Sequence, residues 1–409
     1  MNAVNARLEV PRALEALRHR DFRLLFAGQA VSLIGDAAFV TALGWKTFTL
    51  AGSTKLGIVL LCQSGALLTT LLIGGALADR LSRRRLMIVS DLTRLVAVGV
   101  LAGVDAGGHL TFTLLAVFAV LVGLGDGFFY PAFGGIVPLV VEQPSIPSAN
   151  SLIGVARWGS ILIGPAFAGF LYHPAGSAVV FAADAGSFLV SAVLVYRTRP
   201  RVIETAEREG TLREIVAGAR YVARVPWLWV TIVLFGVVLM LQLAPQQVLM
   251  PKLVSTQWHR GVGSYALLTT SMGVGTVTGT VLFGQIQPKR RRGVISYVLW
   301  VVNSCALVGV ALAPWYELAG ALMVARGVCV GFGVAIWETM LMELVPEHLL
   351  SRVVSLDYFG SFGLMPVGLA LAAGVSGLAA PGALIAAGAG VNAVLLAIVL
   401  TRPWLRAVD

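Results

Sequence analysis

Charged side chains are scarce in this sequence, because Asp, Glu, Lys and Arg together make up only 12% of its 409 residues. A soluble domain carries about twice that share and needs a polar surface around its core. The low charge therefore excludes an ordinary soluble protein. Hydrophobic side chains reach 57% and the mean hydropathy is +0.86, which indicates a protein with many membrane-spanning segments.

Residues that build metal, redox and nucleotide sites are also few. The three cysteines, Cys62, Cys305 and Cys329, form no Cys-x-x-Cys pair, and the five histidines show no ligand spacing. No G-x-x-x-x-G-K-[ST] loop is present, so ATP hydrolysis by this chain is not expected. The net charge of +10 comes from short basic clusters between apolar runs, which does not suit nucleic acid. We therefore expect no metal, no cofactor, no catalytic residues and no enzymatic activity.

Long apolar runs are abundant. A run of about 18 or more residues can cross a bilayer as a helix, and no alternating strand pattern favours a barrel. The sequence predicts twelve spans, at residues 24–48, 56–78, 86–104, 109–132, 150–172, 178–197, 226–248, 263–286, 293–313, 317–340, 355–377 and 380–401.

The distribution of basic residues predicts the orientation of these spans. With both termini inside, 23 of the 30 Lys and Arg residues fall on the cytoplasmic side, and Lys55, Lys252 and Arg260 fall on the opposite side. The remaining four lie inside the spans or at their ends, at Lys46, Arg94, Arg157 and Arg326. The longest hydrophilic stretch, 198–225, would then be a cytoplasmic linker, with a helix from Thr211 to Arg224. We expect a multi-pass protein of the cell membrane, monomeric, with the bilayer as its surroundings.

The two sides of this linker resemble each other. Gly123-Leu124-Gly125 recurs as Gly331-Phe332-Gly333, and Val137-Pro138 recurs as Val345-Pro346, both with an offset of 208 residues. Internal duplication of six-helix units is typical of transporters. The expected organisation is a six-helix bundle at 1–197, the linker at 198–225 and a second six-helix bundle at 226–409.

The loop at residues 74–85 reads Gly-Gly-Ala-Leu-Ala-Asp-Arg-Leu-Ser-Arg-Arg-Arg. It resembles the G-x-x-x-D-R-x-G-R-R loop of the major facilitator superfamily, with Ser82 where that family prefers glycine. The resemblance implies a conformational latch between the two bundles, formed by Asp79, Arg80, Arg83 and Arg84. A plain basic loop on the cytoplasmic side is the alternative.

Further motifs refine this resemblance. Gly159, Gly164, Pro165 and Gly169 in the fifth span look like the Gly-Pro motif of antiporters in this superfamily. The opening segment 17–36 is similar to the branch that contains enterobactin-type and macrolide-type exporters. Val120 stands where many drug–proton antiporters carry an arginine, so coupling through that arginine is not available here.

The resemblance implies an all-α membrane protein, with twelve transmembrane helices in two pseudo-symmetric six-helix bundles. It implies secondary active transport, with proton-coupled efflux of small amphipathic molecules such as drugs, siderophores or secondary metabolites. Small-molecule substrates and protons would be its partners, and multidrug resistance a possible outcome. An importer on the same fold and a lipid-translocating protein are the alternatives.

Acids inside the spans are the candidates for proton coupling, because a charge near the bilayer centre costs at least about 2.5–3.5 kcal/mol. These candidates are Asp36, Asp126, Asp184 and Glu338. Asp36 has no cation within one helical turn in the sequence, so it is the acid best placed to be protonated near neutral pH. A structural carboxylate bonded to a neighbouring helix is the alternative for each.

Asp126 lies between Gly125 and Gly127, where a neighbouring helix can approach closely. Arg157 has a similar predicted depth in the next span, so the two are expected to form an ion pair that is either structural or a proton-dependent switch. Asp91 and Arg94, three residues apart near the start of the third span, are expected to form a local pair at the interface.

The polar and aromatic residues of the spans supply candidates for a substrate cavity. Gln29 and Ser32 share a helix face with Asp36, and the glutamines of the seventh span flank Pro245, where a helix can open. An aromatic lining is equally compatible with plain helix packing. The cavity candidates are Gln29, Ser32, Phe39, Tyr130, Arg157, Gln242, Gln246, Arg326 and Trp337.

Overall fold

The computed structural model describes residues 12–201 and 211–406, and in that part of the chain all regular structure is helical. The helices are α1 (Arg20–Arg80), α2 (Arg83–Ala106), α3 (Phe112–Val140), α4 (Ile146–Tyr196), α5 (Thr211–Arg224), α6 (Pro226–Val238), α7 (Ala244–Gln257), α8 (Val262–Ile286), α9 (Arg292–Leu312), α10 (Tyr316–Leu344), α11 (Glu347–Phe362), α12 (Met365–Val375), α13 (Pro381–Leu400) and α14 (Pro403–Arg406), with short helical turns η1 (Arg12–Arg18), η2 (Gln143–Ser145) and η3 (Leu239–Leu243).

Two of these elements each contain two crossings. Within the described residues, ten segments are long and apolar enough to span a membrane, and two of them run over 52 and 54 residues, more than twice the ~20 that one crossing needs. Each is interrupted by a glycine with a positive φ, Gly52 at 82° in α1 and Gly176 at 76° in α4, which other residues rarely adopt. The ten segments therefore correspond to the twelve predicted spans.

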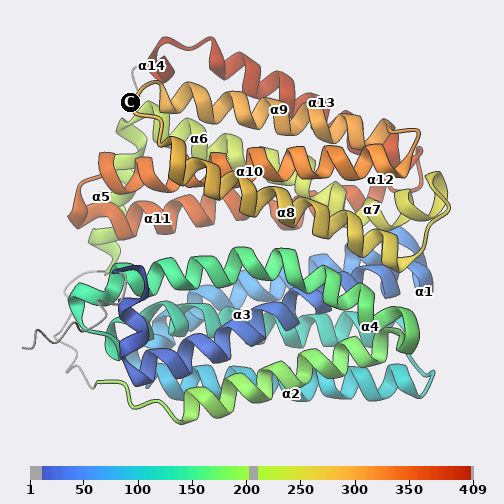
Figure 1. Cartoon of the computed structure of the whole chain (residues 1–409), viewed down its shortest axis with the longest axis horizontal. Coiled ribbons are helices and arrows are strands. Elements are labelled where there is room, and N and C mark those ends of the chain that lie inside the picture. Colours follow the sequence, from blue (N-terminus) through green and yellow to red (C-terminus); the bar gives the residue numbers. More distant parts are fainter. Residues whose placement is uncertain (1–11, 202–210, 407–409) are drawn as a thin grey trace, which may run out of the picture.

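The helices form two groups (Figure 1). Helices α1 to α4 make up what we call the first bundle, and α6 to α14 make up the second bundle. Helix α5, which the sequence predicted over the same residues, lies with η1 and α14 at one end of the molecule. We call that end the linker end and the opposite end the far end.

The two bundles are joined most extensively by α4 against α8 and by α1 against α7 and α12. At the far end, Thr54 Oγ1 of α1 lies 2.8 Å from Ser376 Oγ, just after α12. A methyl group built on Gly57 would lie 2.6 Å from Ala373 Cβ, so α1 and α12 touch at van der Waals distance. The far end is therefore closed.

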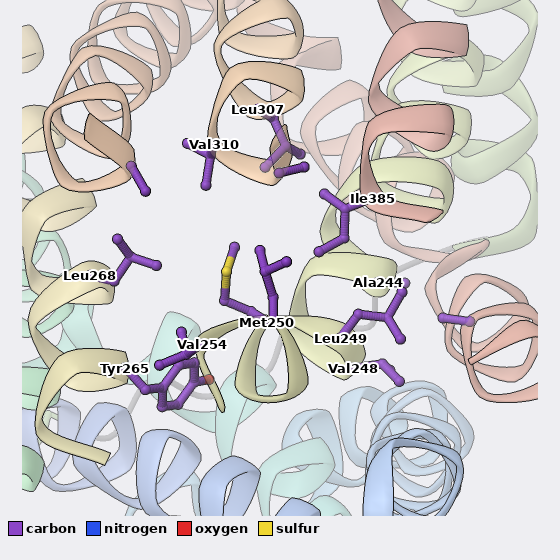
Figure 2. Packing of buried hydrophobic residues seen from close by; sticks show 14 of the residues in the cluster. Ala244, Val248, Leu249, Met250, Val254, Tyr265, Leu268, Leu307, Val310 and Ile385 are labelled. Atoms are coloured by element: carbon purple, nitrogen blue, oxygen red, sulfur yellow. The ribbon is translucent and has the colours of Figure 1, made fainter. Parts of the chain in front are cut away.

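The largest hydrophobic core is shared by both bundles at this closed end. Figure 2 shows its second-bundle part, in which Met250 and Leu249 of α7 face Leu307 of α9 and Ile385 of α13. The first bundle contributes residues of α1 to the same cluster, namely Trp45, Leu56 and Leu60. Folding of the second bundle and closure of the far end therefore bury a common set of side chains.

The helix does not open at Pro245, as the sequence suggested that it could. The chain passes from α6 through a π-helical turn, η3, into α7, and Pro245 lies in the first turn of α7. Because the helix is continuous here, Pro245 lacks the N–H of an intrahelical hydrogen bond, and the π-helical turn before it accommodates the proline. The eleventh span, by contrast, is divided into α11 and α12 around Gly363 and Leu364.

Candidate functional site

A buried arginine forms the centre of the candidate site. Arg94 lies near the middle of the 24-residue helix α2, and its side chain is 1% exposed. Its Nη1 donates to Asp126 Oδ1 of α3 at 2.9 Å, and its Nη2 donates to Asp91 Oδ1 of α2 at 2.5 Å. One guanidinium thus holds two carboxylates from two helices, a geometry for which its planar fork is suited.

The surroundings of Arg94 fix its position. Its guanidinium lies 4.4 Å from the ring centroids of both Phe129 and Phe188, a favourable contact for a cation. A methyl group on Gly125 would lie 2.6 Å from Arg94 Cγ, and one on Gly127 would lie 2.8 Å from the carbonyl oxygen of Leu67. The glycines beside Asp126 therefore permit the close approach that the sequence predicted, to α2 on one side and α1 on the other.

These contacts correct two predictions. The cation bonded to Asp126 is Arg94, and the expected pairing with Arg157 is wrong. Asp91 and Arg94 do form the predicted pair, but both side chains are buried, at 0% and 1% exposure, and not at an interface. A buried pair is tolerated when further hydrogen bonds satisfy its polar atoms. Ser191 donates to Asp91 Oδ2 at 2.8 Å, whereas Arg94 Nε has no hydrogen-bond partner among the described residues.

Gln29 and Ser32 belong to the same buried region and do not line a cavity. Gln29 is 4% exposed and its Nε2 donates to Ser191 Oγ at 3.2 Å, while Ser32 is 2% exposed. Phe39, another cavity candidate, is 2% exposed and packs on Phe181 of α4. The face of α1 that carries these residues is packed against α4, so we withdraw all three as cavity residues.

Asp36 and Asp184 complete the cluster. Asp36 of α1 is half-buried and lies within electrostatic range of Arg94, Asp126 and Asp91, with no hydrogen bond or ion pair found for it within residues 12–201 and 211–406. Asp184 of α4 is 1% exposed, and Ser187 Oγ donates to its Oδ1 at 3.2 Å. Four carboxylates and one guanidinium therefore share the interior of the first bundle.

A second set of polar residues lies between the bundles. Glu338 of α10 and Arg157 of α4 are both exposed and within electrostatic range of each other. Tyr130 of α3 is 46% exposed and lies within electrostatic range of Tyr358 of α11 in the other bundle. Charged and aromatic groups of both bundles thus approach one another here, as a substrate site between bundles requires.

Trp337 is half-buried beside this region. Its Nε1 donates to Asp357 Oδ2 at 3.0 Å, and Ser361 donates to the other oxygen of that carboxylate at 3.4 Å. Asp357 is therefore an additional acid of the second bundle.

The remaining cavity candidates lie inside the second bundle. Gln242 is 4% exposed and accepts a hydrogen bond from Ser304 at 3.2 Å. Arg326 is 2% exposed, and its Nε donates to Asn303 Oδ1 at 3.3 Å. Gln246 is half-buried, and its Oε1 has no hydrogen-bond partner among the described residues. Burial of Gln242 and Arg326 removes them as cavity residues.

The predicted latch is described in part. The side chains of Asp79 and Arg80 lie outside the described residues, so their roles stay predictions. Arg83 donates to the carbonyl oxygen of Gly135 in α3 at 2.5 Å. Arg84 donates to the carbonyl oxygen of Val195 at 3.3 Å. These contacts stay within the first bundle.

The second bundle repeats one of these contacts. Arg292 pairs with Glu343 Oε2 at 2.5 Å, and these two positions follow Arg83 and Gly135 by 209 and 208 residues. The basic segment that precedes α9 in the second bundle therefore keeps a tie between its arginine and the end of α10, as Arg83 does with α3.

The antiporter-like motif lies at close contacts of α4. A methyl group on Gly164 would collide with Ala37 of α1, and one on Gly169 would lie 2.8 Å from Ala266 Cβ of α8 in the other bundle. Pro165 is buried within the helix, while Gly159 has open space around it. Gly164 thus allows α4 to pack closely on α1 of its own bundle, and Gly169 allows it to pack on α8 of the other bundle.

Sequence reasoning missed Arg94, Asp91 and Asp357 as site residues. Arg94 lies near the middle of the predicted span 86–104, and α2, which begins at Arg83, places it about 17 Å along its axis, so the expected position at an interface was wrong. An arginine at mid-span beside an acid three residues away was the available signal. Asp357 falls just inside the eleventh span and carried no partner signal in the sequence.

Comparisons with known proteins agree with this architecture. The family model described as the Major Facilitator Superfamily matches residues 25–368. The enterobactin exporter EntS of Salmonella paratyphi A is 26% identical over 375 residues, which cover 89% of this chain and 87% of that protein.

Solved structures show the same fold. A bacterial homologue of the iron transporter ferroportin, in an inward-facing state, has a TM-score of 0.70 at 18% identity and covers 94% of this chain and 99% of its own. A bacterial homologue of the human lysosomal transporter Spinster, inward-facing and unoccupied, has a TM-score of 0.68 at 14% identity and covers 95% of both chains. The expected all-α transporter fold is confirmed.

Proposed function

The chain belongs to the major facilitator superfamily, and we propose that it is a proton-coupled exporter of small amphipathic molecules that works by alternating access. The observation that carries the proposal is the state of Asp36. It is half-buried, unbonded within the described residues, and borders a cluster whose only arginine already binds two other carboxylates. A carboxyl group so placed can gain and lose a proton without breaking an ion pair.

Protons suit this cluster better than a metal cation. Among the described residues, no group of three or more His, Cys, Asp or Glu side chains converges as metal ligands would. The carboxylates instead come from four helices and surround a guanidinium, which would repel a bound cation. The coupling ion we assign is therefore the proton, with Asp36 as the leading carrier and Asp126 held by Arg94.

The orientation follows from the basic clusters, which are concentrated at the linker end. We place that end, with both termini, in the cytoplasm of a cell whose membrane this protein spans. The closed far end then faces outward, and the conformation is inward-facing. In this state Arg83 binds Gly135 and Arg84 binds Val195, both in the first bundle, and in our proposal the latch joins the bundles in the opposite state.

The substrate region is the set of residues shared by the bundles. Tyr130 and Tyr358 offer aromatic surface, while Arg157 and Glu338 offer one charge of each sign. Aromatic surface beside charge suits amphipathic molecules. Similarity to an enterobactin exporter supports efflux, and import by the same fold is the direction that the experiment must exclude.

Transport in everted membrane vesicles tests the proposal. Respiration acidifies the vesicle interior, so a proton-coupled exporter should raise the fluorescence of a pH-gradient dye when a transported compound is added. We would test ethidium, erythromycin and enterobactin. Asp36→Asn should abolish this signal and uphill accumulation, and should leave counterflow exchange of the same compound, because asparagine imitates the protonated acid.

Glu317→Gln is the matched control, because Glu317 is 75% exposed at the far end, away from the cluster. It should keep normal coupling. Full coupling in Asp36→Asn at equal expression would make Asp36 structural and would move the assignment to Glu338 or Asp126. Signals only in right-side-out vesicles would show an importer.

A further inference from the structure

Asp184 is the most deeply buried acid of the cluster that has no cationic partner. It is 1% exposed, its Oδ1 accepts a hydrogen bond from Ser187, and its Oδ2 has no hydrogen-bond partner among the described residues. The sequence predicted Asp184 as a proton-coupling candidate, with a structural carboxylate as the alternative. Its environment does not supply what a buried carboxylate ion needs, which is a cation or several donors.

The charges that face Asp184 come from three other helices. Asp36 lies on α1, Arg94 with its partner Asp91 on α2, and Asp126 on α3. Both Nη atoms of the single guanidinium are bonded, one to Asp91 and one to Asp126. If all four acids were ionised, this buried region would carry a net charge of three negatives, so it must hold protons.

Asp184 and Asp36 are adjacent through a glycine. A methyl group on Gly35 would lie 2.5 Å from Asp184 Oδ1 and 2.5 Å from Ser187 Oγ, so the backbone of α1 touches the Asp184 carboxyl one residue before Asp36. Only Asp36 of this pair is partly exposed. Asp36 is therefore the acid of this pair that solvent protons can reach directly.

We propose that Asp184 is a second protonation site of the cluster, which is protonated in this conformation and exchanges its proton with Asp36. In the exchange, the O–H bond at Asp184 breaks as one forms at the Asp36 carboxylate, and the total charge is unchanged. The inference rests on the proposed function for its role in transport, and it allows two protons per cycle instead of one. The protonation of Asp184 itself is testable without any substrate.

Infrared spectroscopy of the purified full-length protein in lipid nanodiscs gives that test. A protonated carboxyl group has a C=O stretch well above the carboxylate bands. With Asp36→Asn as the background, so that Asp36 cannot supply such a band, the protein at neutral pH should show the band, adding Asp184→Asn should remove it, and adding Glu317→Gln should leave it. Absence of the band in this background, or its persistence when Asp184→Asn is added, would overturn the proposal.

Ser187→Ala assigns the band more closely. Loss of the hydrogen bond to Oδ1 should shift the C=O stretch to higher frequency, because the hydrogen bond weakens the carbonyl bond. An unshifted band would contradict the assignment to Asp184.

Thermal unfolding separates this role from a purely structural carboxylate. Asp184→Asn exchanges one neutral group for another and should change the melting temperature much less than Asp91→Asn, which removes a charge bonded to Arg94. An equal loss in both variants would mean that Asp184 is ionised. Should the amide not fit, Asp184→Ser gives the same infrared readout.

The two proposals can fail independently. Loss of coupling in Asp36→Asn together with no protonated band would leave the proposed function intact and refute only the role of Asp184. A band that is lost in Asp184→Asn, together with normal coupling in Asp36→Asn, would refute Asp36 as the carrier and retain the protonated Asp184.

Discussion

Replacing Gly57 by leucine should shift the protein away from the conformation closed at the far end. A methyl group at this position would lie 2.6 Å from Ala373 Cβ and 3.2 Å from the carbonyl oxygen of Leu369, both in the other bundle. Carbon atoms pack favourably at about 3.5–4.0 Å. The leucine side chain, which extends further, has no room unless α1 and α12 separate.

The size of the shift follows from the cost of overpacking, about 1–3 kcal/mol for an inserted side chain. The contact of Gly57 joins the two bundles, so the strain is absent when α1 and α12 separate in the alternative conformation. The whole cost of the overpacking therefore shifts the equilibrium between the two conformations. A coupling energy of about 1–3 kcal/mol corresponds to about a 5- to 150-fold change in the ratio of the two states.

A cross-link across the far end measures this change. Thr54 Oγ1 and Ser376 Oγ lie 2.8 Å apart, so Thr54→Cys with Ser376→Cys, in a protein without its native cysteines, should form a disulfide readily. Gly57→Leu should slow the cross-linking. Gly65→Leu on the same helix is the matched control, because nothing lies within 4 Å of its added carbon. Equal cross-linking rates in the two variants would refute the steric argument.

Two further predictions concern charged contacts. Arg94→Met should lower stability by about 3–5 kcal/mol, because it leaves two buried carboxylates unpaired, whereas Arg94→Lys should lose less by keeping the charge; melting temperatures of the purified variants check both. In Arg94→Met, Asp91 and Asp126 must stay protonated in the folded state, whereas in the unfolded state they release their protons above pH ~4. The stability of this variant should therefore fall as pH rises, and a loss of stability that does not depend on pH would contradict the argument. Glu343→Gln should lower the stability by at most about 1 kcal/mol, because Glu343 is 54% exposed. The double variant Arg292→Glu with Glu343→Arg, which reverses the ion pair, should have the wild-type melting temperature.

The sequence predicted the fold well because the determining signal is local. Span length depends on the number of consecutive apolar residues, and all twelve predicted spans fall on helices. The helix from Thr211 to Arg224 was predicted with its bounds. What the sequence did not reveal is how each pair of spans is joined, because the positive φ of Gly52 and Gly176 has no signature that separates them from other glycines.

The site was predicted less well because pairing depends on helix rotation. Asp126 and Arg157 have similar depths, but depth alone does not choose between α2 and α4 as the neighbour, and Arg94 occupies the place beside Asp126. Gln29 and Asp36 share a face of α1 in the sequence pattern, yet that face is wide enough for Gln29 to be fully buried against α4 while Asp36 stays half-buried. Both outcomes depend on side-chain packing between helices.

The hydrophobic cluster shared by the bundles at the far end has a consequence for engineering and for evolution. Because Trp45, Leu56 and Leu60 pack into the core of the second bundle, any substitution that improves this packing favours one conformation as well as the folded state. A screen for heat resistance should therefore enrich variants that are trapped in the conformation closed at the far end and turn over slowly. Natural selection for transport rate would oppose the same substitutions, so this core should remain less tightly packed than stability alone would allow.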